Sequence, residues 1–171
     1  ENDLTIGAYL KRNDPRDGIV LKSGKSFDSE NLTIGSSSKR RELQFKSHFK
    51  NIICKNIRGN IDSRISKVKR GEYDGTILAL AGIQTLKLDH EIKKIFSEDK
   101  IIPCAGQGVI AVQCRKNDFD NLKILKKIND EDTKICAITE RSLLKTIGGD
   151  CHTALGAYAK IDKNNIIIIA Q

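Results

Sequence analysis

The chain has 171 residues, of which 39% are hydrophobic and 30% charged, and it carries a formal net charge of +8. This length suits one ordinary domain or two small ones, and the composition argues against a membrane span, a signal peptide and wholesale disorder. Aromatic residues make up only 5% and Trp is absent, so we do not expect an aromatic platform for single-stranded nucleic acid.

The predicted elements begin with two strands. The first spans Leu4 to Leu10, and the second spans Ile19 to Leu21 after a dense turn signal at residues 13–18. We expect the polar residues 22–30 to form a surface loop or a short helix.

Strands and helices then alternate regularly. This order and spacing are typical of a doubly wound parallel sheet, in which ligands bind where strand ends meet helix starts. The predicted elements are strand 32–34, helix 39–49, strand 52–57, helix 61–69, strand 76–80 and a further helical stretch after residue 82.

The pattern changes from α/β to α+β near residue 129. Two amphipathic helices and a hairpin dominate this last part of the chain. The predicted elements after residue 88 are a short helix at 89–96, a turn at 103–108, a buried strand from Val109 to Cys114, helices at 118–128 and 131–146, and hairpin strands at 157–161 and 166–170.

The whole excess of positive charge lies between Asn31 and Arg70, where eleven Lys and Arg residues face only two acidic ones. Such a segment favours a polyanionic partner, either nucleic acid or a small molecule with several carboxylates or phosphates. A solvated basic face is the alternative.

Two junctions in this basic segment combine cations with a predicted helix start. One is Gly35-Ser36-Ser37-Ser38-Lys39-Arg40-Arg41, and the other is Arg58-Gly59-Asn60-Ile61-Asp62-Ser63-Arg64. Helix N-termini attract anions, and Arg can clamp a carboxylate or phosphate with two hydrogen bonds. The serines could instead serve only as helix caps. Junctions from adjacent strand–helix units, however, converge on one ligand site.

The five cysteines show no metal-site spacing and, being odd in number, favour reduced thiols in a reducing compartment. Cys54, Cys114 and Cys136 lie in apolar patterns, so we expect them to be small buried residues. Cys151 differs because it lies in a polar, glycine-rich turn.

Several short motifs follow one another along nearly the whole chain. They are Asp14-Pro15-Arg16-Asp17, the junction at 35–41 with Gln44, the junction at 58–64, the stretch 71–82, Gly106-Gln107-Gly108, Glu140-Arg141 and Gly149-Asp150-Cys151 before Gly156-Ala157. Each is weak alone, but the ordered set is specific, and it resembles the porphobilinogen deaminase (hydroxymethylbilane synthase) family.

The resemblance implies a periplasmic-binding-protein-like, doubly wound α/β domain followed by a small α+β domain. Because the chain lacks Met and starts at Glu1, we expect it to be part of a longer protein. The implied parts are the end of a first domain and a hinge at 1–13, a second α/β domain with an anion-binding crevice at 14–104, a segment returning to the missing first domain at 105–128, and an incomplete third domain with the cofactor cysteine at 129–171.

The implied activity is that of a transferase in tetrapyrrole (heme) biosynthesis. It joins four porphobilinogen molecules head to tail into hydroxymethylbilane and releases ammonia. A dipyrromethane cofactor is implied on Cys151 through a thioether, which suits a soft thiolate nucleophile. The family's general-acid Asp is expected upstream of Glu1, and neither Asp14 nor Asp17 matches it. We therefore expect no turnover by this chain alone.

Each pyrrole carries an acetate and a propionate, so the resemblance assigns carboxylate binding to the basic segment. Thr85 stands where the family commonly has another carboxylate-binding Arg. The implied cofactor-binding residues, besides Cys151, are Ser36, Ser38, Arg40, Arg41, Arg58 and Arg64, and the implied substrate-binding residues are Arg40, Arg58, Arg64 and Gln107.

Two other functions stay open: a non-catalytic binder of an anionic metabolite, and a basic nucleic-acid-binding module. The resemblance instead implies porphobilinogen, its polycarboxylate pyrrole chain and the missing first domain as partners, with no specific nucleic acid and no membrane. It also implies a monomeric parent protein in the cytoplasm or a plastid.

Overall fold

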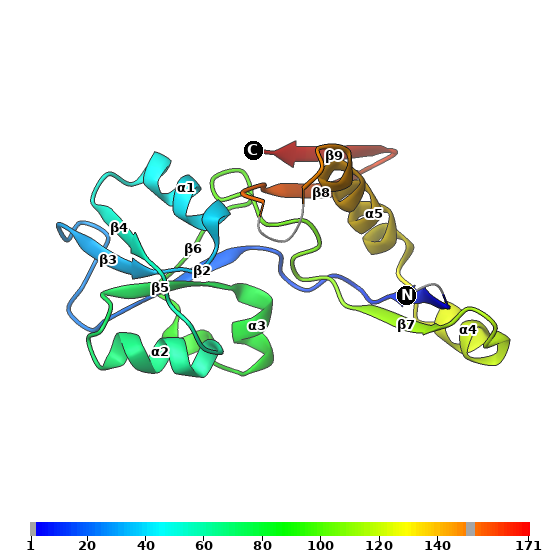
Figure 1. Cartoon of the computed structure of the whole chain (residues 1–171), viewed down its shortest axis with the longest axis horizontal. Coiled ribbons are helices and arrows are strands. Elements are labelled where there is room, and N and C mark those ends of the chain that lie inside the picture. Colours follow the sequence, from blue (N-terminus) through cyan, green and yellow to red (C-terminus); the bar gives the residue numbers. More distant parts are fainter. Residues whose placement is uncertain (1–2, 150–152) are drawn as a thin grey trace.

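The computed structural model describes residues 3–149 and 153–171. It has an α/β unit at one end and a smaller group of strands and helices at the other (Figure 1). The α/β unit is built on one five-stranded sheet with the strand order β4-β3-β5-β2-β6. Its strands are β2 (Asp17–Leu21), β3 (Leu32–Gly35), β4 (Ile52–Lys55), β5 (Gly75–Ala79) and β6 (Lys94–Ile95).

The sheet is mixed. Strands β3, β4 and β5 are parallel, as predicted, but β2 runs antiparallel to β5, and β6 runs antiparallel to β2. The predicted parallel arrangement is thus confirmed for β3, β4 and β5, and β2 and β6 extend the sheet beyond β5 in antiparallel order. The cause lies in residues 22–31, which form no helix between β2 and β3 and are too short for the helical crossover that parallel strands require.

Helices cover both faces of the sheet, which confirms the doubly wound α/β architecture. Strand β2 shows why: all five of its residues are buried, and successive side chains point to opposite faces. Ile19 belongs to one apolar cluster and Val20 to the other. The helices are α1 (Lys39–His48), α2 (Ile61–Lys69) and α3 (Leu80–Thr85).

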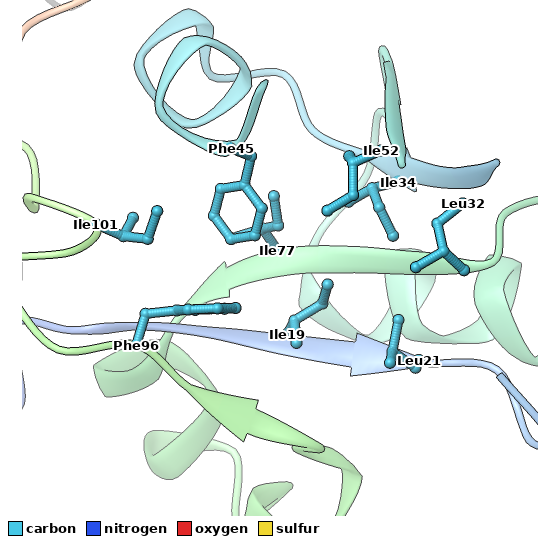
Figure 2. Close-up of a cluster of buried hydrophobic side chains, with 9 residues drawn as sticks. All are labelled: Ile19, Leu21, Leu32, Ile34, Phe45, Ile52, Ile77, Phe96 and Ile101. Atoms are coloured by element: carbon cyan, nitrogen blue, oxygen red, sulfur yellow. The ribbon is translucent and has the colours of Figure 1, made fainter. Parts of the chain in front are cut away.

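The larger apolar cluster lies between α1 and the sheet (Figure 2). Phe45 from α1 meets Phe96 edge to face, with ring centroids 4.9 Å apart. Such an arrangement is favourable for two aromatic quadrupoles. The second cluster, on the opposite face, receives Ile65 and Val68 from α2 and Ile83 from α3. Each face of the sheet thus has its own helical cover.

The predicted helix at 89–96 is wrong for most of its length. Only Asp89–Glu91 forms a short 3₁₀ turn (η1), and the chain then extends into β6. The backbone N–H groups of Lys93 and Phe96 donate to the carbonyls of Ile19 and Asp17 in β2. Pairing with an existing strand, together with burial of the Phe96 ring, outweighs the local helical pattern.

A two-stranded antiparallel sheet joins β1 (Leu4–Tyr9) to β7 (Ala111–Arg115), followed by α4 (Phe119–Lys126). Strand β7 was predicted to be buried, which is wrong, because its residues alternate between exposed and half-buried. Ile110, just before it, is 50% exposed. Helix α4 packs against this small sheet, and the alternation leaves Ala111, Gln113 and Arg115 of β7 exposed.

The last group contains α5 (Glu131–Thr146) and the hairpin of β8 (Ala157–Asp162) and β9 (Asn165–Ala170). These elements confirm the predicted α+β pattern. Asp130 caps α5 by accepting a hydrogen bond from the Thr133 N–H. In the ranges that the structure describes, no helix is long and apolar enough to span a bilayer.

Two connections run side by side between the α/β unit and the rest of the molecule. The Leu10 N–H donates to the Ile110 carbonyl, and the Asn13 N–H donates to the Gly108 carbonyl, each over 2.9 Å. Gly108 must stay small, because a Cβ there would lie 2.6 Å from the Asn13 carbonyl oxygen and its φ is +81°. The domain boundaries expected after residues 13 and 104 remain predictions.

Candidate anion-binding site

The two predicted junctions meet at the carboxyl ends of β3 and β4, because these strands are parallel neighbours. They border a crevice of about 330 Å³ that is lined by the three serines, Lys55 and Arg58, among others. Ser37 ties the junctions together, since its hydroxyl donates to the Ile57 carbonyl over 2.6 Å. The expected convergence of the two junctions is therefore present for these residues.

The hydroxyls of Ser36 and Ser38 have local hydrogen bonds. Ser38 caps α1 by accepting from the Arg41 N–H, which fits the capping alternative. Ser36 is buried, and its Oγ accepts from the Ser38 N–H over 3.2 Å. Both hydroxyls nevertheless border the same hollow as the exposed Arg58 side chain. The arrangement places a helix N-terminus and a free cation around one space that an anion can enter.

A buried arginine cluster lies next to this crevice. Arg40 is only 3% exposed and donates to Asp17 Oδ2 over 2.8 Å. Arg41 donates to Asp17 Oδ1 over 2.7 Å. Gln107 Nε2 also donates to Asp17 Oδ1, over 2.8 Å, while its Oε1 lies 3.4–3.5 Å from both guanidinium groups. One carboxylate therefore orients three of the side chains that border the predicted site.

The charges in this cluster are not balanced. Burial opposes ionisation of Asp17, but attraction to Arg41 and Arg40 outweighs it and holds the Asp17 pKa below its ordinary value. Two guanidinium groups thus share one carboxylate. The Nε–H groups of both arginines are buried and have no partner in the described part of the chain. The cluster has both the positive charge and the free donors for one further carboxylate.

Arg58 lines the crevice with the serines, whereas Arg64 does not. The Arg64 pKa is lowered, first by burial and second by repulsion from Arg41. Its Nε donates to the Gly59 carbonyl over 2.7 Å. The predicted residues thus include two groups, the crevice with Ser36, Ser38 and Arg58 and the cluster with Arg40, Arg41 and Gln107, while Arg64 is held at the second junction by Gly59.

The expected cofactor residue Cys151 lies outside the described residues. Gly149 and Thr153, on either side of that gap, line a cavity of about 930 Å³. Arg141 and Lys145, one helical turn apart on α5, and the exposed Cys104 line it as well. The lining has room for a ligand of several rings and offers cations for its carboxylates.

The remaining cysteines fit their expectation only in part. Cys136 is buried, as predicted, but Cys54 and Cys114 are half-buried. Burial raises the pKa of both the Cys54 and Cys136 thiols, which keeps them protonated and unreactive.

The sequence analysis missed two acidic residues that organise this region. Asp17 was set aside because it does not match the family's general acid. Glu140 was noted only as part of a motif, yet it is fully buried and accepts two hydrogen bonds from the Arg12 guanidinium, one at 2.6 Å. It also accepts from the backbone N–H groups of Gly106 and Ala159.

A sequence signal for Glu140 existed. Thr133, Cys136, Ala137 and Glu140 follow the spacing of one helical face, and all four are buried in α5. An acidic side chain on an otherwise uncharged buried face indicates a buried partner of opposite charge. The nearest such partner, Arg12, lies 128 residues away in the sequence and could not be chosen from the pattern alone.

Together, the mixed sheet, the paired junctions and the arginine cluster define an α/β protein with a basic site whose donors suit an anion. Family comparison agrees with this class. Residues 1–123 match the model described as "Porphobilinogen deaminase, dipyromethane cofactor binding domain", and residues 134–171 match "Porphobilinogen deaminase, C-terminal domain". The chain therefore belongs to the porphobilinogen deaminase family.

Individual relatives agree. The chain is 41% identical to porphobilinogen deaminase of Caldicellulosiruptor saccharolyticus, over 100% of this chain and 59% of that protein. It is 36% identical to that of Coxiella burnetii, over 99% of this chain and 55% of that protein. The chain thus spans a little over half the length of these curated relatives. Among solved structures, an arginine-specific periplasmic binding protein of Salmonella typhimurium aligns with a TM-score of 0.44 and 15% identity, over 84% of this chain and 71% of that one.

Proposed function

We propose that this chain serves tetrapyrrole biosynthesis as part of a transferase that condenses four porphobilinogen molecules into hydroxymethylbilane and releases ammonia. The observation that carries the proposal is the family match along nearly the whole chain. The site geometry supports it, because porphobilinogen carries two carboxylates and the site combines cations with hydroxyl and N–H donors.

The crevice and the arginine cluster would divide the carboxylates between them. Arg58 is exposed at the crevice, and the N-terminus of α1 adds backbone donors and the positive end of its dipole. Arg41 is 12% exposed, so its guanidinium can reach a ligand without leaving Asp17. Arg40, at 3% exposure, can contact a carboxylate only if one enters the cluster.

The dipyrromethane cofactor named by the family model fits the donor set of this site. It would be attached to Cys151 through a thioether and would supply the free pyrrole position to which each new substrate unit is joined. Around it, Arg141 and Lys145 line a cavity large enough for two pyrrole rings. These cations would bind the carboxylates and hold the rings in place.

We further propose that the β1–β7 sheet and α4 pack against an additional domain of the kind that the longer relatives have room for. Ile110, Phe119 and Ile124 are 50%, 68% and 59% exposed. Large apolar side chains exposed on neighbouring elements are consistent with a surface that another domain covers. The reducing compartment, cytoplasm or plastid, is likewise proposed from the free thiols.

The experiment for the cofactor proposal is an intact mass of the chain as purified, under denaturing conditions, followed by a peptide map. We expect the added mass of two linked pyrroles on the peptide that contains Cys151. The matched variants are Cys151→Ser, which should lose the adduct, and Cys104→Ser, which should keep it. An adduct on a different cysteine contradicts the attachment proposed here, whereas an unmodified mass indicates a chain without its cofactor.

A further inference from the structure

Asp17 is the common partner of the buried arginine cluster. It is fully buried at the first position of β2, and its backbone is fixed by pairing with Ala79 in β5. Its two carboxylate oxygens accept hydrogen bonds from Arg40, Arg41 and Gln107. A carboxylate that is fixed by the sheet and accepts from two guanidinium groups and one amide can position the side chains around it.

The two arginines depend on Asp17 to different extents. Arg40 has a second short hydrogen bond, from its NH1 group to the Ile102 carbonyl over 2.6 Å. The other hydrogen bonds of the Arg41 guanidinium, to the Ile77 carbonyl and to Gln107, are both 3.4 Å long. Its contact with Asp17 is the only short one that the structure gives this guanidinium. Removing the Asp17 carboxylate therefore releases Arg41 more than it releases Arg40.

Arg41 also lies beside residues that reach the larger cavity. Its NH2 group and the thiol of Cys104, which lines that cavity, both contact the Oε1 atom of Gln107, each over 3.4 Å. The Arg41 guanidinium can bind a ligand carboxylate at this position only if its orientation is fixed. Two cations beside each other at the start of α1 would otherwise repel and move apart.

We propose that Asp17 is a positioning residue for ligand binding, which acts by holding the Arg41 guanidinium in place beside Gln107. This inference rests on the proposed function, because the ligand is taken to be a carboxylate-bearing pyrrole. Asp17 does not touch the ligand. It supplies half of the negative charge that the two arginines need, and the ligand carboxylate supplies the other half.

Calorimetric titration of the 171-residue chain with porphobilinogen, and separately with glutarate as a simple dicarboxylate, tests this role. We expect Asp17→Asn to weaken the binding of both by about tenfold or more, the effect of losing one charge-assisted contact. Asp14→Asn is the matched control. It makes the same chemical change in the same segment, but the ion pair it breaks is with Arg16, so its affinities should stay within about twofold.

A double-mutant cycle separates positioning from general damage. If Asp17 acts through Arg41, then Asp17→Asn should cost less than about twofold in affinity in an Arg41→Gln background. Equal losses in the two backgrounds overturn the proposal. Wild-type affinity in a folded Asp17→Asn protein also overturns it.

If Asp17→Asn does not fold, the variant Asp17→Glu tests the same positioning role. This variant retains the charge but moves the carboxylate by one methylene, so the cluster stays compensated while Arg41 is displaced. We expect intermediate affinity, and wild-type affinity would show that the position of the carboxylate does not matter. If the wild-type chain binds glutarate but not porphobilinogen, the proposed function is refuted. The role of Asp17 can then still be tested by comparing the glutarate affinities of the variants. Binding of neither ligand overturns both.

Discussion

Replacing Glu140 by Gln is expected to destabilise the protein strongly. Glu140 is fully buried and accepts hydrogen bonds from the Arg12 guanidinium and from the N–H groups of Gly106 and Ala159. These partners come from the two side-by-side connections and from β8. The substitution keeps the shape but removes the negative charge, and it turns one acceptor oxygen into an NH₂ donor that faces other donors.

The size of the loss in unfolding free energy follows from the buried Arg12 charge that remains after the substitution. Arg12 is 12% exposed, so its charge stays largely out of water when its partner is neutralised. Breaking one side of a buried ion pair costs about 3–5 kcal/mol, to which an unsatisfied buried N–H adds about 1–3 kcal/mol. Some relaxation will offset part of this. We therefore expect about 4 kcal/mol of lost unfolding free energy, or roughly 8–16 °C in Tm for a chain of this size.

Thermal and urea unfolding followed by circular dichroism measure this loss. Glu131→Gln provides the matched control, because it makes the same change on the same helix where the side chain is 59% exposed and its partner is Lys134. The control should change the unfolding free energy by less than about 0.5 kcal/mol. A Glu140→Gln loss below about 1 kcal/mol would refute the reasoning, since the buried Arg12 charge would then have found other compensation.

Three further outcomes are expected. Because the folded Asp17 pKa lies below its ordinary value of 3.8, Asp17 stabilises the fold above that value and stops doing so as the pH falls through the folded pKa. Urea titrations at a series of acidic pH values should therefore show a shallower acid loss of stability in Asp17→Asn than in wild type. Gly156→Ala should cost about 1–3 kcal/mol in the same assay, because a Cβ there would lie 2.8 Å from the Ile102 carbonyl oxygen. Arg58→Gln should weaken porphobilinogen binding by roughly three- to tenfold in calorimetry while leaving Tm unchanged, since its side chain is exposed.

The strand and helix pattern of the α/β unit from β2 to α3 could be predicted because its signals are local, whereas β6 could not, because it forms by pairing with the distant β2. Ser38 and Asn60 cap α1 and α2, and both helices start at the predicted residues. The direction of β2 could not be predicted, because it depends on how residues 22–31 return to the sheet. The exposure of β7 also escaped prediction, since an apolar strand pattern does not reveal what covers it.

The site could be predicted as a set of cations, but the pairing of those cations could not. Arg40, Arg41 and Gln107 were assigned by resemblance, whereas their common partner Asp17 is 23, 24 and 90 residues away in the sequence. No periodic pattern links residues at such separations. Which arginines are exposed and which are buried could not be predicted either. Arg40 is buried because α1 packs against the loop at Ile102, another contact between residues far apart in the sequence.

The stacking of Arg12 over Tyr158, 5.0 Å from the ring centroid, gives the chain a built-in optical reporter. The sequence has no Trp and three Tyr, so its near-ultraviolet emission arises from Tyr9, Tyr73 and Tyr158. Tyr9 lines the larger cavity, and Tyr158 lies beneath the guanidinium that joins the connections to α5. Two of the three fluorophores therefore stand where the α/β unit meets the rest of the molecule. Emission from the unlabelled protein will follow rearrangements at this junction, while Tyr73, in the α/β unit, contributes a steady background.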